Sequence, residues 1–181
     1  MEERVYHTFP PVWDASSRLL ILGSFPSVRS REEGFYYGHP RNRFWPLLAA
    51  LTQEPVPTDI PAKKDLLLRH GIALWDVAES CRIIGSSDSS IRDITPVPIR
   101  EVLGGADIQA VFANGSTAWA LYMEYLYPVT QMEAVKLPKA FPDSGNGKLF
   151  AADTNAGLRR TQRIGQQLDD GFDGRFTVLG N

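Results

Sequence analysis

Residues 19–45 read LLILGSFPSVRSREEGFYYGHPRNRFW, and most of what the chain reveals about itself starts from this stretch. The apolar run at 19–22 predicts a buried strand, and Phe44 and Trp45 open the next apolar helix. About twenty residues separate the two. Connections between a strand and a helix are usually ~2–6 residues long, and much longer ones are usually functional. Because this loop carries two adjacent tyrosines, a histidine and an asparagine, we expect it to form a pocket wall for a flat ligand.

The bulk composition is typical of one globular domain. The chain has 181 residues, of which 43% are hydrophobic, and no apolar run approaches the length of a membrane span. Its polar start does not resemble a signal peptide, so we expect a cytoplasmic protein, associated with the nucleoid if the source is bacterial. Cys81 is the only cysteine and the histidines are scattered, so neither a disulfide nor a metal site is expected.

Charge leaves two interpretations of the long loop open. The formal net charge is −2, which does not indicate a nucleic-acid-binding protein, although a local basic stripe matters more than the total. Arg29, Arg31, Arg41 and Arg43 fall within the loop, interleaved with aromatic residues. They form either such a stripe or an ordinary solvated surface.

Strand patterns alternate with helix patterns along the chain. We expect strands at 18–22, 72–77, 108–113 and 132–137 and helices at 44–51, 62–70, 99–103 and 117–126. Ser116 is the expected cap of the last helix, and the Ser-rich stretch 80–93 is an expected surface loop. The alternation predicts an α/β fold with a parallel sheet covered on both faces. In such sheets ligands bind beyond the carboxyl ends of the strands, where 23–42, 78–93, 114–116 and the segment after Leu137 converge.

The C-terminal part has a different composition. From Lys139 onward the chain is rich in Gly, Asp, Asn and Arg, and its one helical pattern, at 155–168, has a thin apolar face. We therefore expect a domain at residues 1–138, followed by a segment at 139–181 whose structure the sequence does not indicate.

Each candidate motif in the long loop has two interpretations. Gly23, Ser24, Phe25 and Pro26 form either a strand-ending turn or a pocket floor of backbone N–H groups. The two tyrosines at 36 and 37 either anchor the loop to the core or offer a ring that stacks on a planar base.

Polar residues at the ends of the loop and the strands also have two interpretations. Asn42 is a helix cap or an amide that positions a water or a substrate edge. His39 is a structural imidazole or a contact to a phosphate or a leaving base, and Asp76 is a cap or a carboxylate in the site. Ser89 and the turn at 114–116 either lie in ordinary solvent-exposed loops or contact phosphates. In the second interpretation, the turn binds a phosphate at the N-terminus of the helix that follows it.

Taken together, the motifs resemble the uracil-DNA glycosylase superfamily, and within it the hypoxanthine-DNA glycosylase branch. The resemblance rests on GSFP at 23–26, YYGHPRNRFW at 36–45, GIALWDV at 71–77, DSSI at 88–91 and ANGSTA at 113–118, and it covers roughly residues 15–138. HPxNxFW is also similar to an element of mismatch-specific glycosylases. The resemblance implies a three-layer α/β/α sandwich around a four-stranded, mainly parallel sheet. It implies a monomer that hydrolyses the N-glycosidic bond of hypoxanthine or uracil in DNA without a metal or other cofactor.

The resemblance also implies roles for individual residues. Asn42 takes the place of the main catalytic amide, with His39 as a second catalytic candidate that stabilises the leaving base. Tyr37 stacks on the flipped base, and the segment 23–26 lines the base pocket. The expected DNA contacts are Ser89, Asn114, Gly115, Ser116 and Lys139. Mismatch-specific relatives place a water-positioning Asn where this chain has Phe25, so this task passes to Asn42.

The segment after Pro138 departs from the pattern of the family. The branch has a Leu-Pro-Ser-Thr-Ser-Pro-like segment there, whereas this chain continues with Lys139-Ala140-Phe141. Reading one nucleotide later permits Pro-Ser-Pro-Thr-Ala-Ala-Thr-Ala, which suggests a frameshift or a recent divergence. Two alternatives to an active glycosylase therefore stay open: a catalytically degenerate nucleic-acid or nucleotide-binding module of the same fold, and a small-molecule α/β hydrolase. The second has little support because the chain contains no GxSxG elbow.

Overall fold

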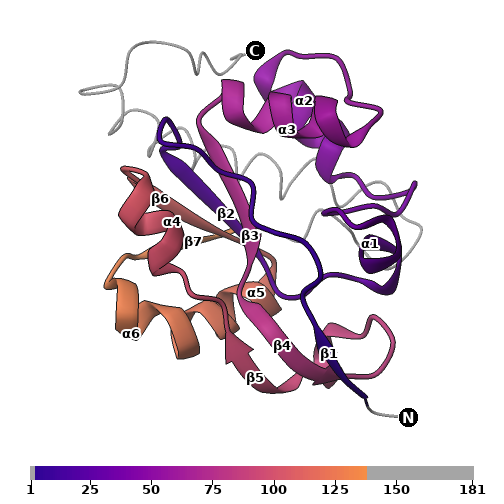
Figure 1. Ribbon diagram of the computed structural model, residues 1–181, viewed down its shortest axis with the longest axis vertical. Coiled ribbons are helices and arrows are strands. Elements are labelled where there is room, and N and C mark those ends of the chain that lie inside the picture. The colour runs from indigo at the N-terminus through magenta and orange to yellow at the C-terminus, as the bar shows by residue number, and fades with distance from the viewer. Residues whose placement is uncertain (1–2, 138–181) are drawn as a thin grey trace.

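The computed structural model describes residues 3–137, and a four-stranded parallel sheet lies at its centre (Figure 1). Its strands are β2 (Leu19–Gly23), β3 (Ile72–Asp76), β6 (Ala110–Asn114) and β7 (Ala134–Leu137), in the order β3-β2-β6-β7. All neighbouring pairs are parallel. The four strands expected from the apolar runs are therefore confirmed, as is the expected sheet.

Helices cover both faces of this sheet and complete the three layers (Figure 1). The helices are α1 (Val28–Glu33), α2 (Phe44–Thr52), α3 (Ile60–Arg69), α4 (Arg100–Gly105), α5 (Ser116–Leu121) and α6 (Tyr127–Thr130). α3 begins where its sequence predicts, because the Asp59 carboxylate accepts a 2.8 Å hydrogen bond from the N–H of Ala62 and Pro61 stands in the first turn. The α/β/α sandwich implied by the resemblance is thus confirmed.

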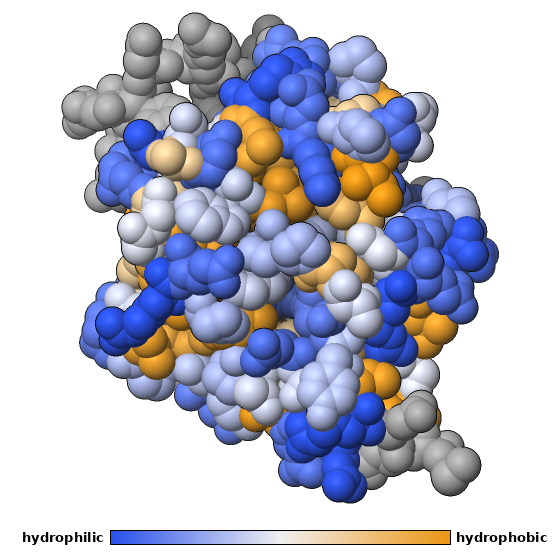
Figure 2. Space-filling model, viewed as in Figure 1, coloured by the Kyte–Doolittle hydropathy of each residue, from blue (hydrophilic) through white to orange (hydrophobic). Residues whose placement is uncertain are grey.

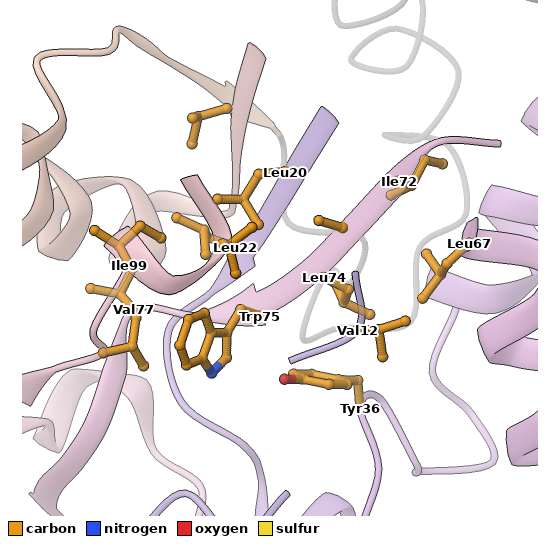
Figure 3. Packing of buried hydrophobic residues seen from close by; sticks show 14 of the residues in the cluster. Val12, Leu20, Leu22, Tyr36, Leu67, Ile72, Leu74, Trp75, Val77 and Ile99 are labelled. Atoms are coloured by element: carbon orange, nitrogen blue, oxygen red, sulfur yellow. The ribbon is translucent and has the colours of Figure 1, made fainter. Parts of the chain in front are cut away.

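The two faces of the sheet bury different halves of the core. Strand residues alternate between the faces, and paired positions of parallel strands share one face. Leu20 and Leu22 point toward Val77 and Ile99 on one side (Figure 3). The other side holds Ile72, Leu74, Val12, Leu67 and Tyr36 (Figure 3). Both faces of the sheet are therefore apolar around β2 and β3, which explains why these two strands read as nearly continuous apolar runs.

A second, antiparallel sheet lies beside the first and was not predicted. It consists of β1 (Glu3–Tyr6), β4 (Ala78–Ile83) and β5 (Arg92–Pro96), in the order β1-β4-β5. The surface loop expected at 80–93 is therefore wrong at its two ends, where residues 80–83 belong to β4 and residues 92–93 to β5. Only the segment between β4 and β5 is a loop, and it contains a short 3-10 turn, η1 (Asp88–Ser90). Three of the four inward positions of β4 are small or polar, and their composition hides the strand pattern.

Two other expectations need correction. The loop at 23–42 contains the helix α1, which the Ser27 side chain caps by accepting a hydrogen bond from the N–H of Ser30. The helix expected at 117–126 is α5 followed by a π-helical turn, η2 (Tyr122–Leu126), just before Pro128, which has no N–H to continue α-helical bonding. Gly115, not Ser116, is the N-terminal cap residue of α5, and no side chain caps it.

On the face viewed in Figure 2, hydrophilic side chains prevail and apolar atoms show in small separate groups. Between residues 3 and 137, no helix has the length and apolar character needed to cross a membrane.

Candidate active site

A cavity of about 180 Å³ opens at the carboxyl ends of β2, β3 and β6. It is lined by residues 23–27, Ser30, Tyr36, Tyr37, Asn42, Asp76, Ser86, Asp88 and Asn114. The volume far exceeds the ~10–15 Å³ that one water needs and falls below the ~300–1,000 Å³ of drug-sized pockets. The cavity therefore has the scale of a single small ring system, and it lies where parallel sheets bind their ligands.

The floor of the cavity is formed where β2 and β3 end side by side. Gly23 and Asp76 are paired across the two strands. A Cβ atom on Gly23 would collide with the Oδ1 atom of Asp76, so only glycine leaves room for this carboxylate. Asp76 is 4% exposed and lines the cavity. Of the two roles weighed for Asp76, the structure shows the carboxylate in the site.

A buried histidine holds the carboxylate of Asp76. The Nε2 atom of His7 lies 3.0 Å from Asp76 Oδ2, and both side chains are almost completely buried. The imidazole packs against Phe9 at 4.5 Å and against Tyr36 at 5.7 Å between ring centroids. His7 follows β1, so the unpredicted antiparallel sheet brings this histidine to the cavity floor.

The two adjacent tyrosines, Tyr36 and Tyr37, have different structural roles. Tyr36 is buried, and its hydroxyl donates a 3.1 Å hydrogen bond to the carbonyl of Pro10, which anchors the loop to the core. Tyr37 lines the cavity, and its ring stacks on Phe44 with centroids 4.0 Å apart. Its hydroxyl oxygen accepts a 2.9 Å hydrogen bond from Asn114 Nδ2. Burial, helped by the charge of Asp76, raises the pKa of Tyr37 far above its usual value, so this hydroxyl stays protonated.

Asn42 lies on the cavity wall and also supports the start of α2. Its Oδ1 accepts a 2.9 Å hydrogen bond from the N–H of Phe44, as a capping side chain does. Its Nδ2 makes no hydrogen bond to the part of the chain that the structure describes. The capping and site roles are therefore compatible, because each uses a different end of the amide.

His39 does not line the cavity, although it is only three residues from Asn42. It is exposed, and its Nδ1 accepts a 3.1 Å hydrogen bond from the N–H of Arg41. The structure therefore places this expected catalytic candidate outside the cavity lining.

The strand-end segment lines the cavity, as the sequence predicts. Ser24 Oγ donates a 3.1 Å hydrogen bond to Asp88 Oδ1, which joins the floor to the loop between β4 and β5. Phe25 is buried and packs with Cys81 and Ile83 of β4. The Arg31 guanidinium lies 5.6 Å from the centroid of the Phe25 ring. Phe25 thus links the two sheets.

The expected DNA contacts are distributed unevenly. Asn114 lines the cavity, while Gly115 is buried and has φ of 105°, which other residues rarely adopt. Ser116 is exposed at the first position of α5, and Ser89 is exposed in the loop before β5. Lys139 lies outside the described residues.

Sequence analysis assigned no cavity-lining role to Ser30, Ser86 or Asp88, and no role to His7 behind the cavity floor. Ser30 and Asp88 line the cavity but stand in stretches that read as polar loop. His7 carries no sequence signal, because its partner Asp76 is 69 residues away. Between residues 3 and 137, no group of three or more His, Cys, Asp or Glu side chains is arranged to hold a metal ion.

The fold and the cavity define an α/β/α protein with a small polar site at the carboxyl ends of its strands. A family model described as the uracil DNA glycosylase superfamily matches residues 10–166, and the chain belongs to this superfamily.

Two curated relatives of the chain are named hypoxanthine DNA glycosylases. The chain is 40% identical over 86 residues to the hypoxanthine DNA glycosylase of Methanosarcina barkeri and 42% identical over 86 residues to that of Methanosarcina acetivorans. Each match covers 47% of this chain and 54% of the relative, so the chain spans about half the length of the curated relatives it matches. A solution NMR structure of a candidate uracil DNA glycosylase from M. acetivorans is also similar. It has a TM-score of 0.57 and 35% identity, and the match covers 73% of this chain and 82% of that one.

Proposed function

We propose that this protein is a DNA glycosylase that hydrolyses the N-glycosidic bond of a deaminated base, hypoxanthine or uracil. The observation that carries the proposal is the base-sized cavity with Tyr37 and Asn42 on its wall, in a chain of the uracil DNA glycosylase superfamily. The names of the two Methanosarcina relatives support hypoxanthine as a substrate.

Binding begins when the target nucleotide leaves the stack, at a cost of a few kcal/mol that is least for a damaged or mispaired base. Tyr37 offers its ring to the flipped base, a contact typically worth ~1–3 kcal/mol. Backbone groups of Ser24 and Phe25 at the cavity floor meet the edge of the base.

Catalysis depends on charge that develops as the glycosidic bond breaks. The sugar becomes positive and the departing base becomes negative, so donors aimed at the base stabilise the transition state. The Nδ2 group of Asn42 is such a donor, since its Oδ1 is already held by the N–H of Phe44. In this proposal Asn42 also orients the attacking water, the task that Phe25 has no polar group to perform. His39, exposed near Asn42, is a second candidate for contact with the leaving base or a phosphate.

The proposed partner is DNA, bound by a monomer in the cytoplasm. Ser89, Ser116 and the Gly115 backbone are proposed to contact the phosphates beside the cavity, and Lys139 completes the set from outside the described residues. The domain boundary at 138 remains a prediction.

The direct test incubates the full chain with duplexes that carry inosine, uracil or no lesion, followed by alkaline cleavage at abasic sites. We expect cleavage of a duplex that carries inosine or uracil, and no cleavage of the duplex without a lesion. Lesion-dependent binding without any abasic product would contradict the proposal and favour the degenerate binding module.

Two substitutions separate the roles of Asn42. Asn42→Asp keeps an oxygen for the N–H of Phe44 but removes the Nδ2 donor, whereas Asn42→Ala removes both. Loss of one transition-state donor typically costs ~100–1,000-fold in kcat, so we expect both variants to lose at least about 100-fold. Gln109→Ala, at the opposite end of the sheet, is the control and should retain full activity. If Asn42→Asp keeps wild-type turnover, its amide donor has no catalytic role.

A further inference from the structure

The lining of the cavity carries negative charge and no positive charge. Asp76 lies on its floor and Asp88 in the loop between β4 and β5, while none of the described basic side chains lines it. The charges of both carboxylates reach the Tyr37 hydroxyl and help to raise its pKa. The Arg31 guanidinium contacts the ring of Phe25, 5.6 Å from the ring centroid, but is not part of the lining. The cavity therefore opposes a negatively charged ring and favours a positively charged one.

Asp88 is fixed at the cavity by the floor and by its own turn. Its Oδ1 atom accepts a 3.1 Å hydrogen bond from Ser24 Oγ. Its backbone carbonyl accepts a 3.3 Å hydrogen bond from the N–H of Ile91, which closes η1. The side chain is half-buried, so water screens its charge only in part. Asp88 thus presents a fixed negative charge to a ring that occupies the cavity.

An aromatic platform borders the same space. The ring of Tyr37 lines the cavity and stacks on Phe44, with centroids 4.0 Å apart and an interplanar angle of 21°. The face of an aromatic ring attracts a cation, and the attraction grows when the site is desolvated. The platform and the two carboxylates therefore favour the same kind of ligand, a flat ring with a delocalised positive charge.

Alkylation of a ring nitrogen gives a purine this charge. In DNA, 7-methylguanine and 3-methyladenine are flat cations. When the glycosidic bond of hypoxanthine breaks, the electron pair leaves with the base, which becomes negative and is opposed by the carboxylates. When the bond of 7-methylguanine breaks, the same electron pair neutralises the base. The positive charge passes to the anomeric carbon of the sugar, where water adds and releases its proton to solvent.

We propose that the cavity also accepts cationic N-alkylated purines, that the protein excises them from DNA, and that Asp88 determines specificity for their charge. The inference rests on the proposed glycosylase reaction and extends it to a second class of damaged base. Asp88 lies near positive charge both before and during bond breaking, so its effect is on binding rather than on kcat. A base that leaves neutral needs no donor aimed at it, so the Nδ2 group of Asn42 matters less for this reaction.

Excision assays test the activity with the full chain. Duplexes carry 7-methylguanine or hypoxanthine, and the loss of 7-methylguanine in buffer alone is the reference. We expect release of 7-methylguanine at least about tenfold faster than in buffer, about 1.4 kcal/mol of transition-state stabilisation. In Asn42→Asp, the loss of activity on hypoxanthine should exceed the loss on 7-methylguanine by at least about tenfold. Equal losses on the two bases would contradict the proposed difference in leaving group.

Binding of duplexes that cannot be cleaved isolates the effect of charge. A 2′-fluoroarabinose beside the base prevents bond breaking. With this sugar, 7-methylguanine is compared with 7-deaza-7-methylguanine, a neutral ring of the same shape, in mildly acidic buffer. We expect the cation to bind at least about fivefold more tightly.

Substitutions of Asp88 assign this preference to its charge. Asp88→Asn should lower the preference for the cation by at least about twofold, the effect of one partly screened charge, and Asp88→Glu should retain it. The control, Asp107→Asn, removes an exposed carboxylate before the amino end of β6 and should leave the preference unchanged. Equal effects of Asp88→Asn and Asp107→Asn would overturn the role of Asp88.

The outcomes also separate this inference from the proposed function. If inosine and uracil duplexes stay intact while 7-methylguanine is released, the excision of deaminated bases fails and the present inference stands. If those duplexes are cleaved but 7-methylguanine is lost only at the rate in buffer, the present inference is overturned. Equal binding of the cation and its neutral counterpart would overturn it as well.

Discussion

Asn114 Nδ2 donates a 2.9 Å hydrogen bond to the hydroxyl oxygen of Tyr37, joining the end of β6 to a loop 77 residues earlier in the chain. The same tyrosine ring stacks on Phe44 at the start of α2. Tyr37 also has φ of 52°, a left-handed backbone that few non-glycine residues adopt. The ring is therefore fixed by three separate constraints before any base enters the cavity.

Substitutions at Tyr37 should separate the ring from the hydroxyl. Tyr37→Phe keeps the ring and should retain most excision activity, while the lost hydrogen bond lowers the free energy of unfolding by about 1 kcal/mol. Tyr37→Ala removes the stacking surface and should lower kcat/KM by about 10- to 100-fold. Single-turnover excision and urea unfolding measure the two effects. Equal losses of activity in both variants would show that the hydroxyl, not the ring, serves the reaction.

Ser30 connects α1 to the turn that follows Tyr37. It is 3% exposed, and its Oγ accepts hydrogen bonds from the N–H of Gly38 at 3.2 Å and from Ser27 Oγ at 3.0 Å. Ser30→Ala leaves the Gly38 N–H without this partner and should lower the free energy of unfolding by about 1–3 kcal/mol. The exposed Ser16→Ala should stay within about 0.5 kcal/mol of the wild type in the same urea titration. A Ser30→Ala variant as stable as Ser16→Ala would contradict this assignment.

Glycine is required at position 23 but not at position 104. In Gly23→Ala the new methyl group must displace the Asp76 carboxylate, so we expect both lower thermal stability and loss of hypoxanthine excision. Gly104 lies in α4, and apart from its chain neighbours and the backbone of its own helix nothing stands within 4 Å of the position that an added methyl group would take, so Gly104→Ala should raise stability by about 0.5–1 kcal/mol. Calorimetric melting of the two variants compares them directly. Wild-type stability and activity in Gly23→Ala would mean that the carboxylate can move without consequence.

The central sheet was predictable mainly because β2, β3 and β6 are largely buried and read as short apolar runs. The antiparallel sheet was not predictable in the same way. β4 fills its inward positions with Ala78, Ser80 and Cys81 as well as Ile83, so its alternation is concealed, and β1 is a short strand of only four residues. The strand that pairs with β1 is β4, which lies more than seventy residues later in the chain, and pairing over such a separation leaves no local sequence pattern.

The residues of the site also divide into those that a local sequence pattern predicts and those that only the tertiary fold brings together. Gly23, Tyr37 and Asn42 stand in one continuous motif, and the sequence alone indicated that they face one cavity. His39 belongs to the same motif but is exposed, since neighbours in a turn point in different directions. His7 and Asp76 meet only through the tertiary fold, so the pair at the cavity floor required the structure.

Cys81 should be unreactive in the folded protein. The thiol is fully buried in β4, and burial raises its pKa from 9.0 to about 11, against the opposing charges of Arg31 and Arg4. At pH 8 only about one thiol in a thousand is then ionised, and the thiolate is the reactive form. Between pH 9 and 11 the thiol ionises in the unfolded chain but not in the folded one, so the free energy of unfolding should fall as the pH rises through this range. Mass spectrometry after iodoacetamide treatment at pH 8 should detect labelling in urea but not in buffer, and rapid labelling of the native protein would show that β4 opens readily.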